Sequence, residues 1–80
     1  MVVFPNPAED NLYISCPSTG SLVLQIELIG IQGKIISSWN EVAASGRIML
    51  DIHEIPSGIY LLRMKYGEEQ VTHKVSIVNR

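Results

Sequence analysis

The chain has 80 residues, of which 46% are hydrophobic and 18% charged, and it carries a net charge of −2. This composition predicts one packed domain with a thin core and excludes a disordered tail. It also argues against nucleic-acid binding, because nucleic-acid binders use clustered basic residues to displace counterions. No apolar run approaches the roughly 18 residues that a membrane-spanning helix needs, so we expect no membrane insertion.

The cysteine content and the first residues limit the function further. Cys16 is the single cysteine, which excludes an internal disulfide framework and a four-thiolate metal site. The stretch Met1-Val2-Val3-Phe4 lacks the charged region and long apolar run of a signal peptide. If the protein is exported, we expect its signal peptide to lie on a longer parent chain.

The first third of the chain predicts extended structure. Prolines on both sides of Asn6 exclude a helix and predict an extended, turn-like path. A short strand is predicted over 11–15, followed by turn formers at 17–20. Alternation over 22–28 predicts a second strand with one apolar face, formed by Leu22, Leu24, Ile26 and Leu28.

The middle of the chain alternates between strands and turns. Gly30-Ile31-Gln32-Gly33 predicts a hairpin connection into a partner strand over 34–39. A polar loop is expected over 40–46 and an alternating strand over 47–52.

The strongest strand signal in the sequence begins at Gly58, directly after Pro56 and Ser57. We expect a positive φ at Gly58, where the chain bends. Tyr60 is expected to place its ring in the core and its hydroxyl on a hydrogen-bond partner. A turn over 66–69 and a last strand over 71–78 complete the chain. In the strand that begins at Gly58, the expected core side chains are Tyr60, Leu62 and Met64. In the last strand, one side is formed by Val71, His73, Val75 and Ile77.

Six or seven short strands separated by turns about every 8–12 residues are typical of an all-β sandwich or barrel. At this length we predict a small antiparallel β-sandwich, because a closed barrel wide enough for a ligand needs longer strands.

No group of residues predicts catalysis, a cofactor or a metal site. His53 and His73 lack the short spacing of a zinc pair, and Cys16 has no adjacent imidazole to activate it. Trp39 and Tyr13 could form a platform for sugar stacking, although lone aromatics in a small sandwich more often belong to the core. We therefore predict that the domain is not an enzyme.

Four motifs occur in a fixed order along the chain: Phe4-Pro5-Asn6-Pro7, Gly33-Lys34, Gly58-Ile59-Tyr60 and Lys74-Val75-Ser76-Ile77. In this order they resemble the type A C-terminal sorting domain of the type IX (Por) secretion system of Bacteroidetes. The resemblance runs from Phe4 to the end, where Arg80 stands in place of the more common lysine. It implies an immunoglobulin-like sandwich of seven strands, with residues 1–80 forming one domain at the end of a larger secreted protein.

The resemblance also implies partners and a location. The cargo would be fused before the domain, which leads it from the periplasm through the outer-membrane translocon to the cell surface or the medium. A sortase-like cysteine endopeptidase would usually remove the domain, and the cargo would be released or attached to an anionic lipopolysaccharide.

We predict that the last strand is the element that the translocon recognises. An exposed terminal strand offers unpaired main-chain groups to a partner sheet, and it also allows weak self-association. Charged side chains near the end of the chain could add charge-assisted contacts. The predicted recognition residues are Lys74, Val75, Ile77 and Arg80. The predicted scaffold residues are Pro5, Asn6, Pro7, Gly33, Lys34, Gly58 and Tyr60.

The sequence also allows one alternative function of a different class. A fibronectin-like or carbohydrate-binding accessory module of a surface enzyme would have the same fold, because such sandwiches host both roles. Oligosaccharide binding around Trp39 would favour that alternative.

Overall fold

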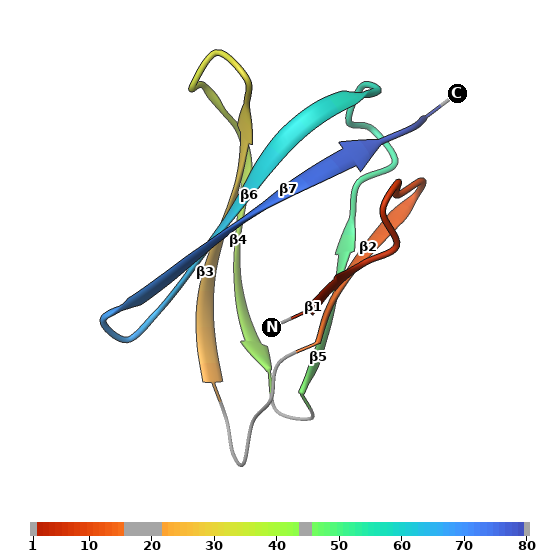
Figure 1. Cartoon of the computed structure of the whole chain (residues 1–80). Helices are drawn as coiled ribbons and strands as arrows, with labels where there is room; N and C mark the ends of the chain where they lie inside the picture. Colours follow the sequence, from red (N-terminus) through yellow and green to blue (C-terminus); the bar gives the residue numbers. More distant parts are fainter. Residues whose placement is uncertain (1, 16–21, 44–45, 80) are drawn as a thin grey trace.

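The computed structural model describes residues 2–15, 22–43 and 46–79. These residues form seven strands and no helix (Figure 1). The strands are β1 (Val2–Phe4), β2 (Asn11–Ser15), β3 (Leu22–Gly30), β4 (Ile35–Ala43), β5 (Arg47–Asp51), β6 (Gly58–Tyr66) and β7 (Glu69–Ile77).

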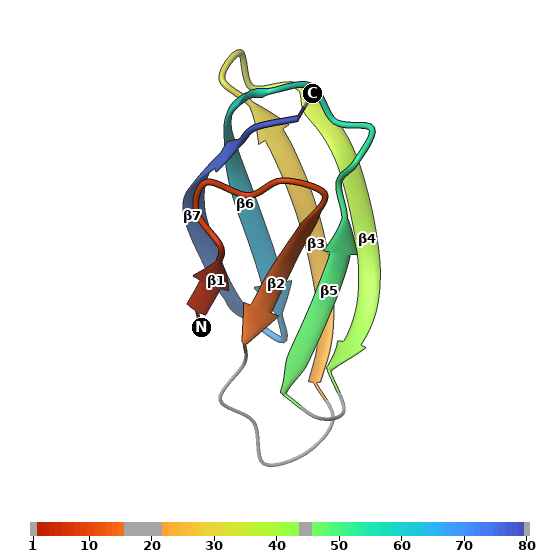
Figure 2. The same cartoon turned by 90° about the vertical axis from the view of Figure 1, so that its right-hand side faces the viewer.

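The strands form two antiparallel sheets that pack face to face. One sheet has the order β1-β2-β5 and the other has the order β4-β3-β6-β7. Figure 2 shows the smaller sheet in front of the larger one. The first, second and fifth strands thus oppose the third, sixth and seventh, as in immunoglobulin-like sandwiches. The predicted all-β sandwich is confirmed.

The core lies between the two sheets. It is built from alternate residues of β2, β3, β5, β6 and β7. A side chain on a strand faces the opposite side from its neighbours, so every second residue of a strand is buried. The most buried large side chains are Leu12, Ile14, Leu24, Ile26, Leu28, Leu50, Ile52, Leu62, Met64, Val75 and Ile77. The predicted alternation of β3, β5, β6 and β7 is therefore confirmed for the described side chains.

Two hairpins use glycine in the left-handed region. In the β3–β4 connection, the Gly33 N–H donates to the Gly30 carbonyl at 2.9 Å and Gly33 has a φ of 85°. A three-residue hairpin loop that ends in a left-handed glycine has this geometry. In the β6–β7 connection, Tyr66 pairs with Glu69, and Gly67 has a φ of 60° at the first of the two turn positions. Both predicted hairpins are confirmed.

Three local predictions were wrong. β4 continues to Ala43, where a loop was expected from residue 40, because β3 offers a pairing partner along its whole length. β7 begins at Glu69, two residues before the predicted start. Gly58 does not have a positive φ: it is the first residue of β6 and has an extended conformation.

Candidate functional site

β7 forms one edge of the four-stranded sheet, as the sequence predicted for the last strand. It pairs with β6 along Glu69–Ile77, and its other side faces outward. In an antiparallel pair, the main-chain groups of alternate residues point toward the partner strand and those between them point away. The outward positions of β7 are Gln70, Thr72, Lys74 and Ser76.

The segment before β2 covers the carboxyl-terminal half of this edge. The Asn6 side chain accepts a hydrogen bond from the Ser76 N–H at 3.0 Å and donates one to the Lys74 carbonyl at 3.3 Å. The Ala8 N–H donates to the Ser76 carbonyl and the Ala8 carbonyl accepts from the Val78 N–H, both at 2.8 Å. Ala8 is fully buried. We call Asn6 and Ala8 the clamp, because together they bond the outward main-chain groups as another strand would.

The clamp limits the part of the last strand that can offer unpaired main-chain groups to a partner. The Lys74 carbonyl, both main-chain groups of Ser76 and the Val78 N–H are already bonded. Within the described part of β7, the outward main-chain groups that form no hydrogen bond with the clamp are the N–H and C=O groups of Gln70 and Thr72 and the N–H of Lys74. We call this stretch, Gln70–Lys74, the open edge.

The four predicted recognition residues have different environments. Lys74 is exposed on the outer face of the sheet. The side chains of Val75 and Ile77 are each only 1% exposed, because they belong to the core. In the folded domain these two side chains are covered by the core, and the recognition role of the four residues stays a prediction. Arg80 lies outside the described residues.

Tyr60 fixes the turn that leads into β6. Its hydroxyl donates to the Pro56 carbonyl at 2.6 Å, and its ring is mostly buried. A tyrosine at the start of the sixth strand that bonds back to the preceding turn is a common feature of immunoglobulin-like sandwiches. A Cβ atom added at Gly58 would meet the Tyr60 ring at 3.5 Å, which is ordinary contact distance. A longer side chain at position 58 would compete with the ring for this space.

Two predicted scaffold motifs that are distant in the sequence meet at one end of the four-stranded sheet. Lys34 lies at the tip of the β3–β4 hairpin, and its carbonyl accepts from the Gly30 N–H at 2.8 Å. Gly30 pairs with Tyr60 of β6. A hollow of about 220 Å³ there is lined by residues that include Lys34, Ile59 and Tyr60. The two motifs thus shape the same end of the sheet.

Two residues that no sequence motif predicted, Asn79 and Ser57, hold the chain just after β7. Asn79 donates through its side-chain nitrogen to the carbonyls of Ile52 and Ile55, at 2.9 and 2.5 Å. The Ser57 hydroxyl donates to the Asn79 carbonyl and accepts from the Asn79 N–H, each at 2.7 Å. Nothing local marks these residues, since the partners are more than 20 positions apart.

Comparison with known families matches residues 2–78 to the secretion system C-terminal sorting domain. The chain belongs to this family. It is therefore a non-catalytic sorting and secretion signal of the type IX (Por) secretion system. Membership implies a fused cargo that is secreted or associated with the outer membrane, and contact with the secretion machinery. No curated protein matches the chain.

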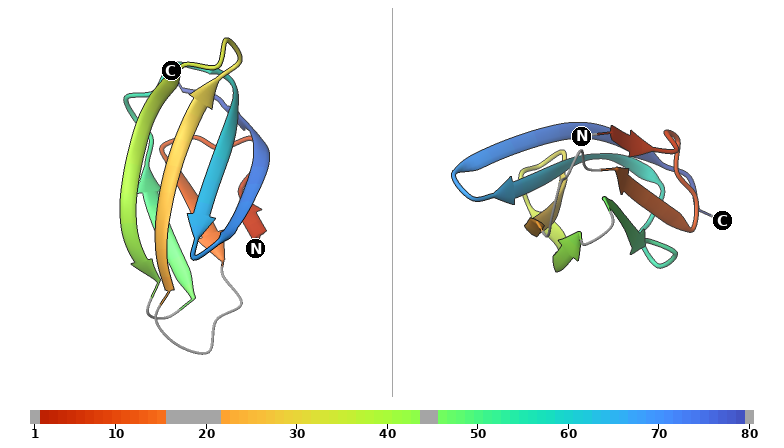
Figure 3. Two further views of the ribbon diagram at one scale, coloured as in Figure 1. Left: turned by 90° about the vertical axis from the view of Figure 1, so that its left-hand side faces the viewer. Right: turned by 90° about the horizontal axis from the view of Figure 1, so that it is seen from below.

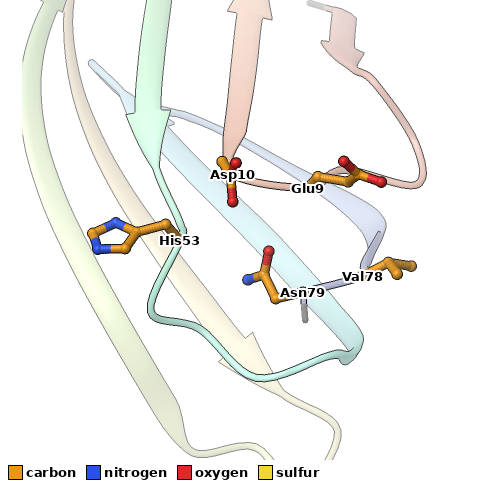
Figure 4. Close-up of a pocket in the computed structure, with 5 residues that line it drawn as sticks. All are labelled: Glu9, Asp10, His53, Val78 and Asn79. Atoms are coloured by element: carbon orange, nitrogen blue, oxygen red, sulfur yellow. The ribbon is translucent and has the colours of Figure 1, made fainter.

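One hollow of the sorting domain, beside His53, does not bring reactive groups together. It measures about 370 Å³ and is lined by Glu9, Asp10, His53, Val78 and Asn79 (Figure 4). The imidazole of His53 points away from Asp10, and the Glu9 side chain extends away from both. Among the residues that the structure describes, no group of three His, Cys, Asp or Glu side chains could hold a metal ion. No described helix is long and apolar enough to span a membrane.

His53 instead pairs with its neighbour on the surface. Its Nδ1 lies 2.7 Å from the Asp51 carboxylate, and both side chains are more than half exposed. The hydrogen bond with the carboxylate raises the pKa of His53 above its ordinary value. The same bond lowers the pKa of Asp51. This exposed pair influences the surface charge at the rim of that hollow.

The structure does not form the sugar platform that Trp39 and Tyr13 could have built. Trp39 lies on β4 and packs partly against the core, whereas Tyr13 lies on β2 of the other sheet. Tyr13 stacks on Phe4 with ring centroids 5.6 Å apart, and the Arg47 guanidinium lies 5.1 Å from both rings. The cation therefore already occupies the aromatic surface.

Proposed function

We propose that the secretion machinery recognises the open edge of β7, Gln70–Lys74, by adding a strand of its own to the sheet. The free N–H and C=O groups of an edge strand are a template for such pairing. This kind of recognition depends on backbone geometry and so works for any cargo fused to the domain. The observation that carries the proposal is that the clamp bonds the rest of the β7 edge and leaves this stretch open.

The neighbouring residues have complementary roles in this proposal. Lys74 extends from the open edge into solvent and adds a charge-assisted contact with the partner. Val75 and Ile77 anchor β7 in the core, and Asn6 keeps the adjacent half of the strand in register. A rigid strand loses less conformational entropy on binding than a mobile one.

The later fate of the cargo completes the proposal. The fusion passes from the periplasm through the translocon, and a sortase-like cysteine endopeptidase removes the sorting domain. The cargo then remains on the cell surface or enters the medium. The family membership supports this order of events, and a substitution in the open edge should block it at the first step.

A proline at Thr72 tests the proposal directly. The Thr72 N–H faces away from β6, so proline removes an outward donor without removing a β6–β7 hydrogen bond. We expect a reporter fused to Thr72→Pro to stay in the periplasm of a host that has the secretion system. The wild-type fusion should reach the surface or the medium.

The matched control is Asn40→Pro on β4, the other edge of the same sheet. By the same alternation, the Asn40 main chain also faces outward, so the two prolines make equivalent changes on opposite edges. Circular dichroism of both fusions would establish that they fold. Normal export of folded Thr72→Pro would refute the proposal, as would equal retention of both folded variants. If Thr72→Pro does not fold, Lys74→Ala replaces it and should lower export without unfolding the domain.

A further inference from the structure

The outer face of the four-stranded sheet carries an apolar row that crosses the strands. Ile35 on β4 pairs with Ile29 on β3, Ile29 pairs with Leu61 on β6, and Leu61 pairs with Lys74 on β7. Directly opposed side chains in antiparallel strands lie about 4.5–5.5 Å apart, so these residues form a continuous strip. Ile59 extends the strip, and Ile35, Ile59 and Leu61 are 40–50% exposed. We call Ile29, Ile35, Ile59 and Leu61 the apolar row.

Basic side chains border the apolar row. Arg63, Lys65 and Lys74 lie on the same face, because they alternate with the buried residues of β6 and β7. Among the described residues of this face, Glu27 is the one carboxylate, and it accepts two hydrogen bonds from Arg63, at 2.6 and 2.9 Å. Arg63, Lys65, Lys74 and Glu27 together give this face a charge of +2. Because the net charge of the chain is −2, the other residues together carry −4.

This charge distribution favours one class of partner. A positive face on an otherwise negative domain attracts a surface bordered by carboxylates. It also opposes pairing of this face with the same face of a second copy, since like charges would meet. Arg63, Lys65 and Lys74 are spread over two strands, and Arg63 is already paired with Glu27, whereas proteins directed to anionic lipid carry clusters of about four to eight free cations.

The chain enters the sorting domain through a strand of the other sheet. The cargo precedes the sorting domain, and the chain enters through β1, which belongs to the three-stranded sheet. The left view of Figure 3 looks onto the four-stranded sheet and shows β1 at its side, next to the edge that β7 forms. The chain therefore enters beside this edge and does not cross the apolar row.

We propose that the outer face of the four-stranded sheet docks onto a protein of the secretion machinery whose surface is apolar in the centre and bordered by carboxylates. This inference rests on the proposed function and adds a second contact beside the open edge. Four strands about 4.8 Å apart, each of nine residues at about 3.3 Å per residue, span roughly 600 Å² in projection. A standard protein interface buries about 800 Å² of accessible surface on each partner. The accessible surface of a face covered with side chains exceeds its flat projection, so this face approaches the standard size.

The double variant Ile59→Ser, Leu61→Ser tests the docking face. Both side chains are exposed, so the fold should survive, while the centre of the contact becomes polar. We expect about a tenfold fall in the amount of reporter at the surface or in the medium, as for loss of a central apolar anchor. Lys65→Glu should lower export without removing any apolar surface.

The matched control is Val2→Ser, Met49→Ser on the outer face of the three-stranded sheet, where both residues are similarly exposed. This control should be exported like the wild type. Normal export of the Ile59, Leu61 variant would overturn the docking face. If Thr72→Pro were retained in the same cells, the proposed recognition of the edge would stand alone. If Thr72→Pro were also exported normally, both proposals would fail.

Two measurements on the purified cargo fusion identify the occupant. Sedimentation should show no dimer that depends on the apolar row, and such a dimer would replace the proposed partner by a second copy. Vesicles that contain about one third anionic lipid should not bind the wild-type fusion. Vesicle binding that the Ile59→Ser, Leu61→Ser variant loses would assign the face to a membrane and overturn the proposal.

Discussion

Replacing Asn6 with alanine should loosen the carboxyl-terminal half of β7. The change removes the acceptor for the Ser76 N–H and the donor to the Lys74 carbonyl, at 3.0 and 3.3 Å. A hydrogen bond contributes about 0.5–1.5 kcal/mol, and Asn6 is exposed to competing water, so we expect a loss of about 1–2 kcal/mol. The core of a domain this small supplies only about 3–5 kcal/mol in total. The clamp is therefore a large share of the stability.

Urea and thermal unfolding followed by circular dichroism measure this loss. A change of 1 kcal/mol shifts the melting temperature of a domain of this size by about 4–8 °C, so Asn6→Ala should melt roughly 5–15 °C lower. Hydrogen exchange should accelerate at the Ser76 amide and stay slow in β3. The control is Asn40→Ala, because the Asn40 side chain is exposed and forms no hydrogen bond to the described residues.

Two outcomes would refute this reasoning. One is an unfolding curve of Asn6→Ala that matches that of Asn40→Ala. The other is unchanged exchange at Ser76, which would show that water replaces the side chain at no cost. Asn6→Asp refines the test, since it keeps an acceptor for Ser76 but loses the donor to the Lys74 carbonyl. It should restore protection at Ser76 while its stability remains below that of the wild type.

Three further predictions concern the fold and the surface charge. Tyr60→Phe removes the hydrogen bond to Pro56 and should cost about 1 kcal/mol in urea unfolding, with the core packing retained. Leu62→Ala should cost about 2–5 kcal/mol, because Leu62 is fully buried, and should leave much of the domain unfolded at 37 °C. The raised pKa of His53 means that its pairing with Asp51 stabilises the fold at lower pH and is lost as the pH rises through that pKa. The lowered pKa of Asp51 adds a loss as the pH falls through its own value, and Asp51→Asn should return the NMR titration of His53 toward its ordinary midpoint.

Local sequence patterns were sufficient to predict most strands. The alternation of Leu24, Ile26 and Leu28 shows a strand with one buried face, because a strand repeats every two residues. Gly33 and Gly67 mark hairpins, because glycine adopts positive φ without a steric cost. These signals are carried by neighbouring residues and need no knowledge of the rest of the chain.

The ordered motifs also predicted the family, and with it the role of the domain as a sorting signal. Neither composition nor any single residue carries this information. The order of motifs does, because each motif corresponds to a different part of the same fold. Tyr60, for example, closes the turn before β6, and Asn6 bonds the edge of β7.

Only the tertiary structure decided which part of the last strand is open. Asn6 and Ser76 are 70 positions apart, and no local pattern in either segment indicates that they are bonded. The end of β4 was also mispredicted, because a strand continues for as long as its neighbour offers main-chain partners. The charge of the outer face likewise depends on which residues the register brings side by side. The sequence alone therefore determined the strands, the turns and the family, while long-range pairing determined the surface that a partner can reach.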